Sequence, residues 1–200
     1  MTKTELDTYW NAGLTYAAYQ AEWERQLTEK PADKEARKMQ HYRRYNAERT
    51  QMVEAEFVPS DETVAAMASI SRAQKWLVLT EDWCGDSAVL LPVAERIARD
   101  AEQVDLRILP RDEHLDLMDQ YLTNGGRSIP KLIAMDAETG EELFTWGPRS
   151  DAAAAKFLEL KATGIEKPQV VAGLVDWYAE GGWKTAESEL AMLMEANRRG

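Results

Sequence analysis

The sequence contains a single cysteine, Cys84, and only two histidines, His41 and His114. One cysteine forms no disulfide within its own chain and builds no cysteine zinc site. The histidines stand 73 positions apart, which is not a spacing of metal ligands. We therefore expect no metal ion in this protein.

The sequence also lacks any apolar run of 18 residues, so no transmembrane helix is expected. Residues 1–7 have neither the apolar core nor the small-residue cleavage site of a secretory signal peptide. These features predict a cytoplasmic protein.

Basic residues are scarce in the middle of the chain. The net charge of the sequence is −11, and residues 59–150 hold 17 acidic against 9 basic side chains. A surface of this sign repels phosphate backbones and anionic membranes. We therefore expect neither nucleic acid nor a membrane as the main partner.

Proline and glycine divide the rest of the sequence into segments with helical or strand patterns. Helices are predicted over residues 4–29, 32–56, 61–72, 85–103, 112–123, 150–163, 168–180 and 185–198. Short apolar runs typical of strands cover residues 76–80, 105–109, 130–136 and 142–146.

The predicted helix over 32–56 is rich in charged residues, and we expect its apolar residues to form one buried side. These residues are Met39, Tyr42, Tyr45, Met52, Val53 and Phe57. Packing of its aromatic side chains against the next domain is favoured over a ligand-binding stripe.

The order of these elements predicts an α/β fold. The strands over 76–80 and 105–109 are joined by a helix, so they should be parallel with a right-handed crossover. The strands over 130–136 and 142–146 are joined by a tight turn, so they should be antiparallel. We expect a central mixed sheet of about four strands, flanked by helices.

Cys84 directly follows a predicted strand and opens a predicted helix. The free N–H groups and the dipole of a helix start stabilise a thiolate, and the Ser87 hydroxyl could donate to the sulfur. The nearby carboxylates of Asp82 and Asp86 have the opposite effect on the thiol pKa. The sequence leaves the sign of the net pKa shift open. The alternative is that Cys84 is only a small buried hydrophobic residue.

The residues around Cys84 resemble the active site of thioredoxins. The segment Trp83-Cys84-Gly85-Asp86-Ser87 is similar to the Trp-Cys-Gly-Pro-Cys motif of that family, and Pro92 lies where the family has a helix-kinking proline. Residues 125–132 resemble the segment that carries the thioredoxin cis-proline, here Pro130. Gly147 falls where the family has a glycine beside the active site.

This resemblance covers about residues 60–160 and is greatest to a bacterial branch with added terminal helices. It implies a thioredoxin-like fold. A thioredoxin-like domain would occupy residues 59–162, with an N-terminal helical extension over 1–58 and a C-terminal helical extension over 163–200.

The resemblance also implies roles for the matched residues. Cys84 would be the nucleophile, and Trp83 would shield one side of its sulfur. Pro130 would be cis, and Ile129 would offer its backbone to a bound peptide or thiol. The alternative for Pro130 is an ordinary trans proline at a strand start. The predicted catalytic residues are Cys84, Ser87, Trp83 and Asp86, and the predicted substrate-binding residues are Ile129, Pro130 and Gly147.

Three positions depart from the family pattern. Ser87 stands where thioredoxins have a second cysteine, Val78 where they have a buried acid, and Asp86 where they have proline. Without the second cysteine, nothing on the chain could release a mixed disulfide formed by Cys84. A second thiol, such as glutathione or a partner cysteine, would have to do so.

Three hypotheses follow. The first is a monothiol thiol–disulfide oxidoreductase that needs no cofactor and uses glutathione or protein thiols and disulfides as partners. The second is a non-redox binding module, in which the aromatic N-terminal helices and the acidic residues at 81–86 and 112–119 select a partner. The third is an iron–sulfur cluster shared across a dimer, as in some single-cysteine glutaredoxins. Asp86 and the acidic middle segment fit that third hypothesis poorly.

Overall fold

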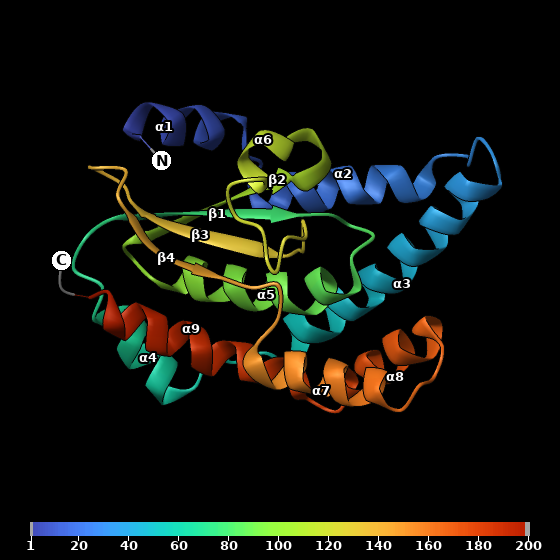
Figure 1. Ribbon diagram of the computed structural model, residues 1–200. Coiled ribbons are helices and arrows are strands. Elements are labelled where there is room, and N and C mark those ends of the chain that lie inside the picture. The colour runs from blue at the N-terminus through green and yellow to red at the C-terminus, as the bar shows by residue number, and fades with distance from the viewer. Residues whose placement is uncertain (1, 199–200) are drawn as a thin grey trace.

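A four-stranded mixed sheet forms the centre of the protein (Figure 1). The computed structural model describes residues 2–198. β1 (Gln74–Thr80) lies between β2 (Val104–Pro110) and β3 (Lys131–Asp136), and β4 (Glu142–Trp146) pairs with β3. β1 and β2 are parallel, whereas β3 is antiparallel to both β1 and β4. The predicted mixed sheet and both predicted strand pairings are confirmed.

β1 forms a strand that is covered on both faces. Trp76 and Val78 belong to the larger hydrophobic core, and Leu77 and Leu79 belong to a smaller core on the opposite face. This alternation follows from the two-residue period of a strand. Both faces of β1 are therefore covered, and the chain leaves the sheet at the loop that follows Thr80.

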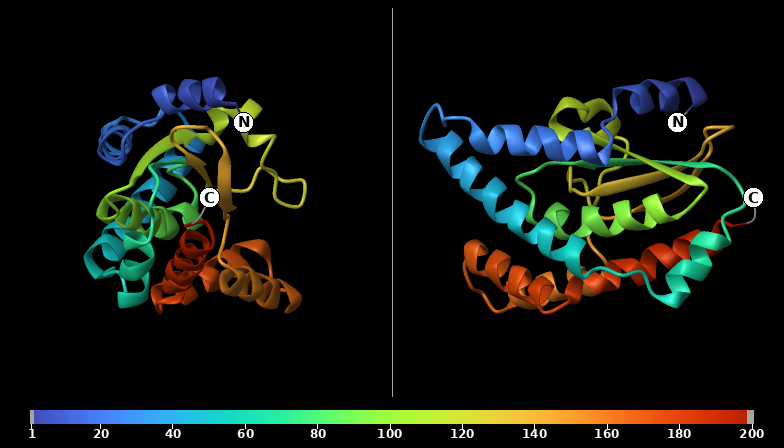
Figure 2. Two further views of the ribbon diagram at one scale, coloured as in Figure 1. Left: turned by 90° about the vertical axis from the view of Figure 1, so that its left-hand side faces the viewer. Right: turned by 180° about the vertical axis from the view of Figure 1, so that it is seen from behind.

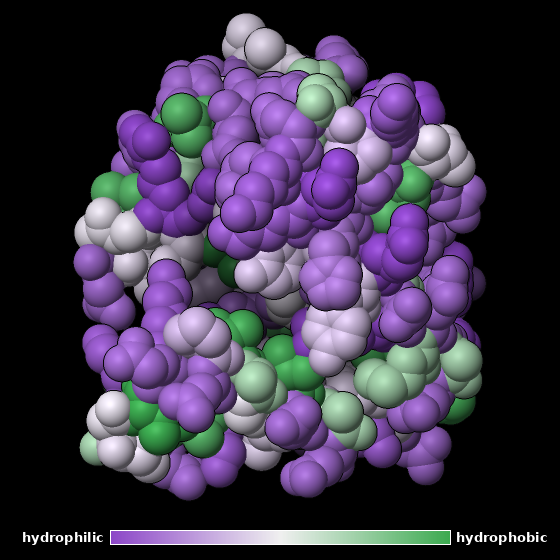
Figure 3. Space-filling view, turned by 90° about the vertical axis from the view of Figure 1, so that its right-hand side faces the viewer, coloured by the Kyte–Doolittle hydropathy of each residue, from purple (hydrophilic) through white to green (hydrophobic). Residues whose placement is uncertain are grey.

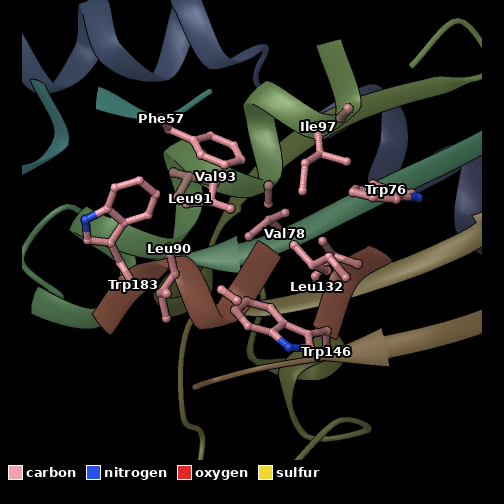
Figure 4. Close-up of a cluster of buried hydrophobic side chains, with 14 of the residues drawn as sticks. Phe57, Trp76, Val78, Leu90, Leu91, Val93, Ile97, Leu132, Trp146 and Trp183 are labelled. Carbon is pink, nitrogen blue, oxygen red and sulfur yellow. The ribbon is translucent and has the colours of Figure 1, made fainter. Parts of the chain in front are cut away.

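The larger core lies between the sheet and a layer of helices beneath it in Figure 1. These helices are α4 (Asp61–Ala68), α5 (Gly85–Asp100), α7 (Asp151–Ala162), α8 (Lys167–Ala179) and α9 (Thr185–Ala196). Figure 4 shows Trp146 and Leu132 facing this core from the strands, and Phe57 and Trp183 closing it on the far side of α5. The rings of Phe57 and Trp183 meet edge to face at 5.6 Å.

Other helices cover the opposite face and the β2 edge of the sheet (Figure 2). α1 (Lys3–Ala12) and the short α6 (Leu115–Met118) enclose the smaller core, which contains Leu6, Leu117 and Met118. α2 (Tyr16–Thr28) contacts β2, and α3 (Lys34–Glu56) returns from its end to pack on α5. Among residues 2–198, no helix combines the length and the apolar character needed to cross a bilayer.

The single helix predicted over 4–29 is wrong, because the chain breaks between α1 and α2. Leu14 forms an isolated bridge with Ile108 at the edge of the sheet, with N–H···O distances of 2.8 and 2.9 Å in the two directions. Gly13 allows this approach, because a Cβ there would lie 2.7 Å from the Cβ of Arg107. Apolar residues such as Trp10, Leu14 and Ala17 recur at three- and four-residue steps across the break, so helical periodicity alone did not reveal it.

The helix predicted over 112–123 is also wrong. The structure has a 3-10 helix over Arg111–Glu113, the four-residue α6, and a turn closed by a bridge between Thr123 and Gly126.

The helix predicted over 32–56 is confirmed as α3, but its buried side differs from the prediction. Tyr42 and Tyr45 are each 46% exposed. Polar Asn46 and Thr50 are buried instead, because both donate to backbone carbonyls around the start of α5. The carbonyls are those of Asp82 and Ala88.

Candidate functional site

Cys84 lies where the parallel strands end and α5 begins (Figure 1). It is the N-cap residue of α5, and its side chain makes no capping hydrogen bond. The two ends of the described chain lie at the opposite end of the molecule. Figure 3 looks onto the Cys84 end, which is hollowed near its middle, with more of its hydrophobic residues in the lower half.

The Cys84 thiol faces the loop that contains Pro130. Its sulfur lies 3.5 Å from the carbonyl oxygen of Ile129, to which the thiol donates. The Ile129–Pro130 peptide bond is cis, as the resemblance implied. Gly147 closes this loop from behind, because it has a φ of +100° and a Cβ there would lie 2.3 Å from the Pro130 carbonyl oxygen. Ile129 and Gly147 lie 45 and 63 positions after Cys84 in the sequence, and the fold brings both to the loop that the thiol faces.

Lys131 ties the segments around Pro130 together. Its buried ammonium group donates to the Thr123 hydroxyl and to the Gly147 carbonyl, both at 2.8 Å. Burial lowers the pKa of Lys131. Sequence reasoning missed this residue, although a lysine at the start of an otherwise apolar strand was a usable signal.

Asp86 is held in a buried ion pair. The Arg149 guanidinium donates to its two carboxylate oxygens at 3.0 and 2.6 Å, and the Tyr178 hydroxyl donates at 3.0 Å. Side-chain exposure is 11% for Asp86 and 24% for Arg149. Burial raises the pKa of Asp86, although Arg149 and Tyr178 act in the opposite direction. Sequence reasoning identified Asp86 but missed both partners, which lie 63 and 92 positions further along the chain.

The environment of Cys84 raises its pKa. Burial has the largest effect, and the Asp86 carboxylate adds to it. The Ser87 hydroxyl and the backbone N–H groups of Asp86 and Ser87 lower the pKa but do not outweigh those two causes. The helix-start effect expected from the sequence is therefore present, and burial and Asp86 exceed it.

Ser87 is buried one turn into α5, with 3% of its surface exposed. Its hydroxyl has no hydrogen-bond partner among residues 2–198. This hydroxyl can therefore donate to the sulfur once the thiol loses its proton. Such a bond would stabilise the thiolate, which is why Ser87 lowers the pKa of Cys84.

The loop before Cys84 is fixed by α3. The Arg43 guanidinium donates to both carboxylate oxygens of Asp82 at 2.8 Å, and the Asn46 side chain donates to the Asp82 carbonyl at 2.9 Å. Trp83 lies partly exposed beside the thiol, with the Arg111 guanidinium 5.1 Å from its ring centre. Sequence reasoning singled out Trp83 and Asp82 but not the arginines that hold them.

A family model described as thioredoxin matches residues 32–162. The chain belongs to the thioredoxin family. The predicted thioredoxin-like fold, with extra helices at both ends, is thereby confirmed. The match starts before α3, so it includes the helix whose Asn46 and Arg43 hold the loop before Cys84.

Two crystal structures resemble this thioredoxin-family chain over nearly its whole length. One is a protein of unknown function from Pseudomonas aeruginosa, 20% identical, with a TM-score of 0.59 and coverage of 93% of this chain and 94% of that chain. The other is an HIV epitope-scaffold, 19% identical, with a TM-score of 0.60 and the same coverage. No curated protein matches. At this identity the structural likeness shows the fold alone.

The departures from the thioredoxin pattern persist in three dimensions. Val78, where the family has a buried acid, is 2% exposed within the larger core. No group of three or more histidine, cysteine or carboxylate side chains within residues 2–198 is arranged to hold a metal ion. The polar groups around the sulfur are Ser87, the Ile129 carbonyl and the Asp86–Arg149 pair.

Proposed function

We propose that this thioredoxin-family protein performs thiol–disulfide exchange as a monothiol, with Cys84 as the nucleophile. The observation that carries the proposal is the approach of the Cys84 sulfur to the Ile129 carbonyl beside Pro130, at the start of α5. An extended peptide that pairs with the backbone of this loop would bring its sulfur to the thiol. Trp83 and Gly147 would flank the bound segment.

The proposed reaction has two exchange steps. The Cys84 thiolate attacks one sulfur of a substrate disulfide, the substrate S–S bond breaks, and a mixed disulfide with Cys84 forms. The departing thiolate takes up a proton. A second thiol, from glutathione or a protein, then attacks the mixed disulfide and releases Cys84 as a thiolate. The number of disulfide bonds stays constant, so no further oxidant or reductant is needed.

The raised pKa of Cys84 determines how this reaction depends on pH. Only the thiolate attacks a disulfide, so a raised pKa reduces the reactive fraction at pH 7. The rate of disulfide exchange should therefore continue to increase at pH values above the pKa of an ordinary thiol, about 8.5. A thiolate of higher pKa is also intrinsically more nucleophilic, which offsets part of the loss.

The alternative function is a non-redox binding module, and the raised pKa of Cys84 is the observation that favours it. In that case the loop around Pro130 would bind a peptide without forming a covalent bond. The two functions differ in whether Cys84 is needed for partner capture.

The deciding experiment exposes the protein to oxidised glutathione at pH 7 and pH 9 and measures intact mass. We expect one glutathionyl adduct on the wild-type protein, formed faster at pH 9, and none on Cys84→Ser. The absence of an adduct at both pH values would overturn the exchange function. Capture of the same partners by Cys84→Ala would then support the binding module.

Replacing Ser87 with cysteine is expected to complete a dithiol cycle. Residues three apart on a helix have Cβ atoms roughly 5–6 Å apart, so a small tightening of the first turn would allow a disulfide with Cys84. We expect Ser87→Cys to catalyse the reduction of insulin by dithiothreitol at least about tenfold faster than the wild-type protein.

The matched control is Ser71→Cys, which adds a second thiol at an exposed position away from the site. It should show the wild-type rate. Equal rates for Ser87→Cys and Ser71→Cys would contradict the assignment of position 87 as the place of a resolving thiol.

A further inference from the structure

A cleft of about 730 Å³ adjoins the loop that leads to Cys84. One wall is α2, and the others are Arg43 of α3, residues 81–82, and the segment from Pro110 to His114. The cleft therefore lies beyond the carboxyl ends of the parallel strands β1 and β2, where open α/β sheets bind their ligands. Its volume falls in the range of small-ligand sites.

The cleft has two acidic groups without an ion-pair partner. Asp82 is paired with Arg43 and Glu22 with Arg25, so those charges are balanced. Glu81 and Glu113 also line the cleft, and neither forms a salt bridge with any residue in 2–198. The Glu81 carboxylate accepts one hydrogen bond, from the Asp112 backbone N–H at 2.8 Å, and Glu113 is exposed. The cleft thus has a surplus of negative charge.

Beside these carboxylates the cleft has an apolar and aromatic wall. Leu14, Tyr19 and Trp23 line it, and the Tyr19 and Trp23 rings meet edge to face at 5.9 Å. The Trp23 side chain is 6% exposed, and its N–H has no acceptor within residues 2–198. The wall is therefore mainly apolar, and the Trp23 N–H lies buried behind it.

We propose that this cleft binds a lysine or arginine side chain of the protein whose disulfide Cys84 attacks. The inference rests on the proposed exchange function and names its substrate class. The aliphatic stem of such a side chain would lie along the aromatic wall, while its cationic end approached Glu81 and Glu113. Glutathione carries fewer ammonium groups than carboxylates and is negatively charged overall, so an acidic cleft disfavours it and a basic protein segment is the fitting partner.

The position of the basic residue follows from chain geometry. Glu81 and Cys84 are the two ends of a turn in which the Cys84 N–H donates to the Glu81 carbonyl at 3.1 Å, so their Cα atoms lie within about 7 Å of each other. An extended partner segment that places a cysteine sulfur at Cys84 would therefore reach the cleft with a side chain within about three positions of that cysteine.

The test uses synthetic peptides with one cysteine, activated as a mixed disulfide with 2-thiopyridine. One set has lysine three positions before or after the cysteine, and the matched set has glutamine there. Attack by Cys84 on the peptide sulfur releases 2-thiopyridine, whose absorbance gives the rate. We expect the better placed lysine peptide to react about fivefold faster than its glutamine counterpart at low salt, and the preference to decline as salt is added.

Variants of the cleft carboxylates locate the effect. The double variant Glu81→Gln, Glu113→Gln should react with the lysine and glutamine peptides at about equal rates. Glu113 is exposed, so the single Glu113→Gln variant gives a partial loss without risk to the fold. The control Glu102→Gln changes an exposed carboxylate outside the cleft and should keep the full preference.

The two proposals fail in different ways. Equal rates for lysine and glutamine peptides, both depending on Cys84, would overturn the cleft inference and leave the exchange function standing. A lysine preference retained in the double variant would also overturn it. If no peptide reacts faster with the wild-type protein than with Cys84→Ser, the exchange function itself is wrong.

Discussion

Replacing Asp86 with asparagine is expected to speed the reaction of Cys84 with iodoacetamide at pH 7 by roughly three- to tenfold. The Asp86 carboxylate raises the pKa of the Cys84 thiol, and an amide of similar shape removes that charge. The guanidinium of Arg149 then loses its anionic partner and favours the thiolate. The rate of modification, followed by mass as a function of pH, should show its rise shifted to lower pH.

The same substitution should destabilise the protein. The Asp86–Arg149 pair is mostly buried, and removing one member leaves the other charge without compensation. We expect a loss of about 3 kcal/mol in the free energy of unfolding, the lower end of the range for buried pairs, since Arg149 keeps some contact with solvent. Unfolding in urea measures this loss.

The control for both effects is Asp105→Asn, which changes an exposed carboxylate on β2. It should alter neither the thiol reactivity nor the unfolding free energy by a measurable amount. A Cys84 reactivity at pH 7 that is unchanged or lower in Asp86→Asn would contradict the role given to this carboxylate.

Replacing Gly147 with alanine is expected to destabilise the protein by about 3–5 kcal/mol. The backbone at Gly147 has a φ of +100°, which strains any residue with a Cβ. In addition, the new Cβ would lie 2.3 Å from the carbonyl oxygen of Pro130, a backbone atom that can move only with its loop. Because that loop faces Cys84, the reactivity of the thiol should change as well.

Gly164→Ala separates the two causes. Gly164 also has a positive φ, of +75°, but a Cβ there would meet no atom within 4 Å. This variant should therefore lose only about 1–2 kcal/mol, the cost of the left-handed conformation. Equal losses in the two variants, measured by chemical unfolding, would contradict the steric role of Gly147.

The strands were predictable because their signals are local. The apolar run ending at Thr80 and the turn at 138–141 are contained in a few consecutive residues. The position of Cys84 at a helix start followed from the same run, and Pro130 and Gly147 from the motif resemblance. Each of these needed no knowledge of a distant segment.

The errors occurred where a distant contact overrides a local pattern. The break at Gly13 depends on the bridge between Leu14 and Ile108, on a strand some ninety residues later. The burial of Asn46 and Thr50, rather than Tyr42 and Tyr45, depends on carbonyl groups at the start of α5. Helical periodicity has no information about either partner.

Cys84 illustrates the same division within the site. The sequence by itself determined that one thiol opens a helix after a buried strand, with two carboxylates and a serine nearby. Only the tertiary structure decided that the pKa of this thiol is raised, because desolvation depends on atoms from many segments. It also decided that Asp86 is paired with the Arg149 guanidinium and the Tyr178 hydroxyl, since Arg149, just before α7, and Tyr178, on α8, reach Asp86 only when the chain folds.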